Sequence, residues 1–275
     1  MVIALTLLKG IRKHALRVAG LGCLALFPAF ETPLAAGGVP AAETVVRRIL
    51  DRAAAVSTNT QPYQFTKRTT VEELDHHGNV RSTKVKLYDV TQMGGVTRAR
   101  LVEMDAEGRR LDPDNQAKRE ESARDQLTRS SKGGRRGQFE RLLTEELFRR
   151  FDWTVERRET LEGRTLLRVS FLSRDPDASA DKLMDRVINR MTGVIWVDER
   201  DWEIARAEMR LTDRVTLWAG LLGVLDNFQL TLLREPGADQ VWYVKQSNVE
   251  LSGRKLFGTV RYRAKETSEN FHRAE

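Results

Sequence analysis

The sequence is poor in the residues on which most catalytic and metal sites depend. Its 275 residues include one cysteine and four histidines. A single cysteine, Cys23, excludes a disulfide framework within the chain and a cysteine-rich zinc site. None of the strings HExxH, CxxC, GxSxG or GxxxxGKS/T occurs, so common hydrolase, redox and nucleotide-binding signatures are missing. We therefore expect a protein that is not an enzyme, with no catalytic residues, no metal and no cofactor.

The histidines offer little for metal binding. His76 and His77 fall in a predicted turn at 75–79, where adjacent side chains would point to opposite sides. His272 is near the end of the sequence. A zinc site needs about four ligands converging on one point, and no further candidates surround this pair. We interpret the pair as part of a polar turn.

The sequence also lacks a hydrophobic run of the about 20 residues that span a membrane as a helix. The longest apolar stretch, 18–30, is shorter, and the small-residue run PLAAGG follows it. Four basic residues precede it: Lys9, Arg12, Lys13 and Arg17. This layout is typical of a secretory signal peptide with cleavage after Ala36 or Gly38. We expect residues 1–36 to be removed and the product to be periplasmic.

Cys23 raises the question of lipidation, because Gly-Leu-Gly-Cys resembles a lipoprotein signal. The apolar stretch continues past Cys23 to Phe27, however, and Gly20 is a poor residue three places upstream. We therefore do not expect a lipid-anchored form.

The charge balance gives no indication of nucleic-acid binding. The formal net charge of +7 falls to +4 once residues 1–36 are removed. The segment SSKGGRRG at 130–137 is a basic linker without the interleaved aromatic residues that stack on bases. It is interpreted as a solvated loop, with contact to an anionic surface as the alternative.

Hydrophobic periodicity predicts an α+β fold with an antiparallel sheet. Apolar residues recur at helical spacing over 44–56, 138–151 and 175–191, and with strand-like alternation elsewhere. Turn residues break the run 193–263 into short strands, at 198–201, 220–223, 236–239 and 252–253. The strands are expected at 63–74, 80–90, 97–104, 153–161, 165–172 and along 193–263, about ten in all. One domain over 43–271 is expected, with a charged, flexible insert at about 114–137.

Several segments together resemble the LolA/LolB-like group of lipoprotein carriers and outer-membrane lipoprotein-sorting proteins. They are MDAEGRRLDPDNQ, LEGRTLLRVSF, GVIWVDERDWEIARAEMRL and LSGRKLFGTVRYRAKETSENF. The resemblance implies a half-open barrel of about 10–11 antiparallel strands with helices covering the mouth. It also implies a cavity that accepts acyl chains and no catalytic set. The charge-dense segment 114–137 departs from the carriers.

Two sets of residues are candidates for binding. Alternation predicts an inward-facing set that would line a cavity or simply form core: Trp196, Met209, Leu211, Phe228, Leu230 and Leu232. The turn at 218–225 is apolar where turns are usually polar. Its Trp218, Leu221 and Leu222 are either buried at the barrel rim or exposed for contact with a membrane or partner. Large exposed apolar patches are uncommon, which favours burial. The resemblance to the LolB side of the family, which uses a protruding leucine loop, favours exposure.

These features predict an exported envelope protein that non-covalently binds a lipid or lipoprotein acyl chain for carriage or sorting. The alternative is a non-enzymatic sensor or scaffold module of the envelope that uses the same barrel to bind a protein partner. A hollow barrel favours the first hypothesis and a filled barrel the second.

Overall fold

In the computed structural model, the described residues are 38–57, 61–93, 96–111, 144–178, 183–217, 223–255 and 258–274. They form one large sheet with three α-helices and one 3-10 turn. The predicted signal segment 1–36 and the predicted insert 114–137 lie outside the described residues. Among the described residues, no helix is long and apolar enough to cross a membrane.

Two antiparallel meanders make up the sheet. The first contains β1 (Tyr63–Leu74), β2 (Val80–Met93), β3 (Val96–Ala106) and β4 (Arg109–Leu111). The second contains β5 (Phe151–Leu161), β6 (Arg164–Ser173), β7 (Met191–Asp198), β8 (Ile204–Leu211), β9 (Val215–Leu217), β10 (Gly223–Pro236), β11 (Trp242–Lys255) and β12 (Gly258–Arg273). The two meanders join where β12 pairs with β1.

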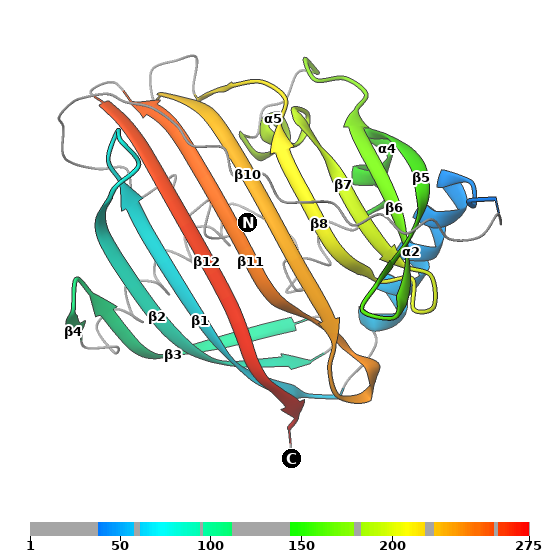
Figure 1. Cartoon of the computed structure of the whole chain (residues 1–275), viewed down its shortest axis with the longest axis horizontal. Coiled ribbons are helices and arrows are strands. Elements are labelled where there is room, and N and C mark those ends of the chain that lie inside the picture. The colour runs from blue at the N-terminus through cyan, green and yellow to red at the C-terminus, as the bar shows by residue number, and fades with distance from the viewer. Residues whose placement is uncertain are drawn as a thin grey trace.

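The strand order is β4-β3-β2-β1-β12-β11-β10-β8-β7-β6-β5, and the short β9 pairs with the start of β10. Among the described residues β4 and β5 end the sheet and do not pair with each other, so the sheet is open (Figure 1). The predicted α+β class with an unclosed antiparallel sheet is confirmed, with 12 strands rather than the expected 10–11.

Three helices pack on one face of this sheet: α2 (Ala42–Ser57), α4 (Glu145–Arg149) and α5 (Leu183–Ile188). They share the main hydrophobic core with residues of the sheet. We call this face the inner face and the opposite one the outer face. Figure 1 shows the helices gathered at the β5–β8 end of the sheet. The predicted covering of a barrel mouth by helices is not confirmed.

The helix α2 forms because its apolar residues recur every three or four positions. Val45 and Ile49 are buried, and Val46 and Leu50 pack beside them, while Arg47 and Arg48 are exposed. This agrees with the helix predicted over 44–56.

The helix predicted over 138–151 is wrong at its end. The described helix, α4, ends at Arg149, and Phe151 already begins β5. Phe148 and Phe151 nevertheless enter the same core, because the Trp153 indole stacks against Phe148 and donates a hydrogen bond to the Phe148 carbonyl at 2.9 Å. The amphipathic spacing therefore identified the core residues correctly, but it placed the end of the helix too late in the sequence.

The turn predicted at Ser252-Gly253 is also wrong, since both residues lie inside β11. Gly253 has a packing role there, because a Cβ at this position would lie 2.5 Å from the Val224 carbonyl oxygen on β10. Glycine is required for this close approach of two backbones and does not mark a reversal of the chain.

Alternation in the sequence predicts that Ala205, Ala207, Met209 and Leu211 share one face. An irregularity between β7 and β8 makes this prediction wrong for Ala205. The register shifts between the pairs Trp196–Arg206 and Val197–Ile204. As a result Ala207 belongs to the inner core, whereas Ala205 packs on the outer face with Trp196. A β-bulge of this kind interrupts the alternation of faces and leaves no sequence signature.

Gly193 gives a first test of the packing on the inner face. A Cβ there would lie 2.1 Å from the Glu208 carbonyl oxygen and 2.9 Å from the Phe171 ring. We expect Gly193→Ala to lower the free energy of unfolding by about 2 kcal/mol or more, because backbone and ring must move apart. Urea denaturation measures the free energy of unfolding of the native protein and the variant. Gly38→Ala, where an added carbon meets nothing within 4 Å, is the control and should change little.

Candidate functional site on the inner face

The register of the strands arranges the inner face in transverse rows. Residues directly opposite one another in neighbouring antiparallel strands project from the same face. One row crosses eight strands and contains only apolar residues and a glycine. We call it the apolar row: Val71, Ala264, Val249, Leu230, Met209, Gly193, Phe171 and Trp153.

Burial along the apolar row is uneven. Phe171, Val249 and Ala264 are buried, whereas Val71, Leu230 and Met209 are half-buried although they pack against the main core. The three helices lie at the β5–β8 end in Figure 1. The apolar row continues past them to Ala264 on β12 and Val71 on β1. The inner face therefore presents partly accessible apolar side chains in the middle of a long sheet.

Five of the six predicted cavity residues lie on this inner face. Met209 and Leu230 are directly opposite each other in the apolar row. Leu211, Phe228 and Leu232 are buried in the same core. Only Met209 and Leu230 are therefore accessible enough to meet a ligand without rearrangement of the core. Their contact with a ligand stays a prediction.

The sixth residue, Trp196, lies on the outer face, because its neighbour Ile195 faces the inner core and successive residues of a strand alternate. The Trp196 indole lies beneath the Arg168 and Arg206 guanidinium groups, 5.8 and 4.8 Å from its ring centroid. Its Nε1 donates a hydrogen bond to Glu159 at 2.8 Å. Trp196 thus has its partners on the face opposite Met209 and Leu230.

The row next to the apolar row changes from apolar to polar along its length. From β5 to β10 it contains aliphatic residues: Val155, Val169, Ile195, Ala207 and Leu232. It then continues through Ser247, Glu266 and Thr69 on β11, β12 and β1. This second row is therefore apolar under the helices and polar at the junction of the two meanders.

Glu266 is the centre of this polar part. Its Oε1 accepts a hydrogen bond from the Thr69 hydroxyl at 3.2 Å and forms an ion pair with the Lys67 Nζ at 3.3 Å. Its Oε2 accepts a hydrogen bond from the Ser247 hydroxyl at 3.4 Å. Lys67 also lies over the Tyr88 ring, 5.2 Å from the centroid. A charged group next to an apolar row is the arrangement that an amphipathic ligand requires.

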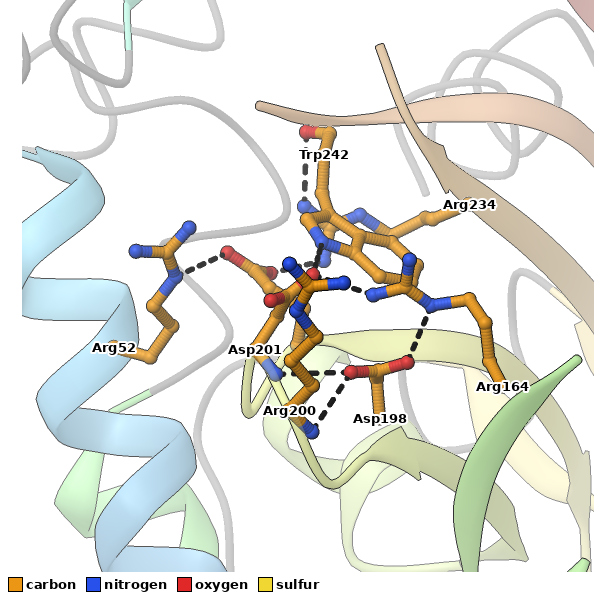
Figure 2. A network of polar contacts seen from close by, with 8 residues as sticks. Arg52, Arg164, Asp198, Arg200, Asp201, Arg234 and Trp242 are labelled. Atoms are coloured by element: carbon orange, nitrogen blue, oxygen red, sulfur yellow. Dashed lines mark hydrogen bonds and ion pairs between the residues drawn. The ribbon is translucent and has the colours of Figure 1, made fainter. Parts of the chain in front are cut away.

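A second polar group lies at the turn between β7 and β8 (Figure 2). Glu203 is nearly buried and binds two arginines, Arg52 of α2 at 3.0 Å and Arg234 of β10 at 2.8 Å. The Arg234 guanidinium also donates to the Trp242 carbonyl at 3.2 Å. The turn, the first helix and the β10–β11 hairpin are thereby connected through one carboxylate.

The same turn holds a second set of ion pairs on its other side. Arg164 binds Asp198 and Asp201, each at 2.6 Å, and the hydrogen bond to Asp198 raises the pKa of the guanidinium. The Asp198 carboxylate accepts two further hydrogen bonds, from the backbone N–H groups of Arg200 and Asp201. Three carboxylates thus match three arginines, so the group is charge-balanced. We interpret it as a structural clamp.

Sequence reasoning missed this clamp. The turn residues 198–201 were recognised as a turn, but nothing in their spacing connects Glu203 with Arg52 or Arg234, which are 151 and 31 positions away. The one available signal was the unusual density of acidic residues in DERDWE.

Other predicted features have less to offer. Trp218, Leu221 and Leu222 lie outside the described residues. The His76 and His77 rings lie against each other, with centroids 3.9 Å apart, and do not point to opposite sides as predicted. Within the described ranges no group of three or more His, Cys, Asp or Glu side chains could hold a metal ion.

The structure of this chain is similar to several solved structures. An outer membrane lipoprotein-sorting protein domain from Vibrio parahaemolyticus is 10% identical, with a TM-score of 0.38 over 85% of this chain and 93% of that one. A LolA superfamily protein from Nitrosomonas europaea is 10% identical, with a TM-score of 0.34 over 84% and 94%. MucB in the Pseudomonas aeruginosa MucA/MucB complex is 9% identical, with a TM-score of 0.26 over 84% and 99%.

The resemblance predicted from the sequence is thus found again, as a distant one. No family model matches the chain. No curated protein matches it either.

The clamp around Glu203 can be tested by removing its two arginines separately. Arg234→Met leaves a buried carboxylate with one partner and should lower the free energy of unfolding by about 3 kcal/mol or more. Arg52→Met should cost about 1 kcal/mol or less, since the Arg52 side chain is 36% exposed. Chemical denaturation measures both. Combining Arg234→Met with Glu203→Gln should restore part of the loss; no recovery would contradict the assigned pairing.

Proposed function

We propose that this protein binds the acyl chain of a lipid or lipoprotein on the inner face of its sheet, without covalent chemistry. One observation carries the proposal: the apolar row continues past the helices and leaves Val71, Leu230 and Met209 half-buried. An acyl chain placed along these residues would be removed from water at a gain of about 0.8 kcal/mol per methylene.

The polar group around Glu266 supports the same function. It lies in the row next to the apolar row, so a ligand there would meet an apolar surface and a charged group together. Free fatty acids, lysolipids and lipoprotein acyl chains share this division into an apolar chain and a polar end. Carriage or sorting of such a ligand in the cell envelope is the role we propose, with the protein exported to the periplasm.

The proposal predicts a specific loss of lipid binding when the apolar row is made polar. Leu230→Gln should weaken binding of a fluorescent fatty-acid analogue about tenfold or more, because it removes contact with roughly two methylenes. Fluorescence titration measures the dissociation constant. The control is Leu233→Gln on the same strand, because Leu233 is 39% exposed and lies on the outer face.

Two results would oppose the proposal. The first is equal affinity of the two variants with an unchanged fold. The second is a native protein that neither retains lipid after purification nor takes up added lipid, as mass spectrometry of extracts would show.

A second candidate function, binding of a protein partner in the envelope, has separate support. β5 forms one end of the sheet and, among the described residues, pairs only with β6. A strand of 11 residues with a free edge can accept an extended segment of another chain. The register shift between Val155 and Arg157 acts against such pairing, since bulges protect sheet edges.

Hydrogen exchange distinguishes the two candidates. On addition of a fatty acid, protection should increase at β10 and β11, which carry the apolar row, and stay unchanged at β5. If envelope extract instead protects β5 while fatty acid protects nothing, the partner-binding function is favoured.

A further inference from the structure

Glu266 lies between two hydroxyl-bearing residues on the inner face. It is directly opposite Ser247 of β11 on one side and Thr69 of β1 on the other. Both of these residues are buried, whereas the Glu266 side chain is 24% exposed. The Lys67 side chain, which forms the ion pair with Glu266, is 26% exposed. The carboxylate and the ammonium group are therefore the parts of this polar group that a ligand on the inner face can reach.

The two oxygens of the Glu266 carboxylate are occupied to different extents. Oε1 accepts a hydrogen bond from the Thr69 hydroxyl at 3.2 Å and faces the Lys67 Nζ at 3.3 Å. Among the described residues, Oε2 accepts only from the Ser247 hydroxyl, at 3.4 Å. Hydrogen bonds between a hydroxyl and an oxygen are about 2.5–3.0 Å long, so this contact is weak. Because each carboxylate oxygen has about two acceptor positions, Oε2 can accept from a further donor.

Lys67 has the complementary capacity to donate. An ammonium group carries about three donors. In the described part of the chain the Lys67 ammonium group contacts Glu266 and lies over the Tyr88 ring, 5.2 Å from its centroid. One donor of Lys67 and one acceptor of Glu266 are therefore open to a ligand. Since both belong to one ion pair, a single small polar group can meet them together.

The charges of this pair select the kind of polar group. Glu266 and Lys67 balance each other, so an added anion would be repelled by the carboxylate and an added cation by the ammonium group. An uncharged group that both donates and accepts hydrogen bonds fits both partners. Hydroxyl and amide groups have this property, whereas a carboxylate only accepts and an ammonium group only donates.

The open acceptor also lies beside the half-buried part of the apolar row. Glu266 and Ala264 are two positions apart on β12, as Ser247 and Val249 are on β11, which corresponds to about 7 Å along a strand. The half-buried Leu230 is opposite Val249 on β10. Because Oε2 accepts from Ser247, it lies on the β11 side of Glu266, which is also the side of Leu230.

We propose that Glu266 and Lys67 bind the uncharged polar end of the amphiphile, through a hydroxyl or amide group that donates to Glu266 Oε2 and accepts from Lys67 Nζ. This inference rests on the proposed function and adds to it the chemical class of the bound molecule: an acyl chain with a neutral, hydroxyl- or amide-bearing end. Thr69 and Ser247 hold the carboxylate in place. A free fatty acid, whose carboxylate only accepts, is the weaker ligand.

The test compares ligands that share a twelve-carbon chain and differ in their polar end. Monolauroylglycerol carries hydroxyl donors, and its derivative with methylated hydroxyls carries acceptors only. Calorimetric titration of the native protein should show about tenfold tighter binding of monolauroylglycerol, because methylation removes a hydrogen bond to a charged group. Lauramide, which carries an amide donor, should also bind more tightly than the methylated derivative. Laurate and dodecylammonium should both bind more weakly than monolauroylglycerol.

Glu266→Gln tests the acceptor on the protein. It removes the charge at nearly the same volume and should weaken binding of monolauroylglycerol about fivefold, while binding of the methylated derivative stays unchanged. Glu269→Gln is the matched control. Glu269 is exposed on β12, and alternation places it on the outer face because its neighbour Ser268 is opposite Lys67. The comparison of ligands on the native protein keeps the test decisive if Glu266→Gln disturbs the fold.

The outcomes separate this inference from the proposed function. Equal affinity of the native protein for monolauroylglycerol and its methylated derivative, or equal losses in Glu266→Gln and Glu269→Gln, overturns the site for the polar end and leaves acyl-chain binding standing. Tighter binding of laurate or dodecylammonium than of monolauroylglycerol also overturns it, in favour of a charged end. Failure of all these amphiphiles to bind overturns the proposed function as well.

Discussion

The register between antiparallel strands is the constraint on which the rest of this structure depends. Each strand pair places opposite residues on one face, and the row of opposite residues continues from Trp153 on β5 to Val71 on β1. A slip of one residue anywhere would exchange the inner and outer faces of every strand beyond it. The apolar row and the polar row beside it both follow from this single alignment.

Much of the sheet was predictable because its strands alternate strongly. Phe228, Leu230 and Leu232 share the inner face as predicted. The prediction was wrong where a local feature interrupts the alternation. These features are the irregular strand pairing near Ala205, the close approach of two backbones at Gly253 and the end of α4 before Phe151. Each depends on a neighbouring strand, and a single sequence does not specify its neighbours.

The polar sites were harder to foresee for a related reason. Lys67 and Glu266 each read as an ordinary charged position on a strand. Their meaning appears only once β12 is placed beside β1, which brings together residues 197 positions apart, as the pair Thr69–Glu266 shows. Trp196 illustrates the opposite error: it was predicted to face inward, although its neighbour Ile195 occupies the inner face.

The pairing of β1 with β12 also sets the order in which this fold can be completed. β1 spans residues 63–74 and its partner spans 258–273, so residues 75–257 separate them. Bringing such distant segments together lowers the conformational entropy of the chain before any contact between them compensates. This slows folding in sheet proteins. Until β12 is present, the first meander has one unpaired edge along β1. During synthesis, that edge would need protection from self-association.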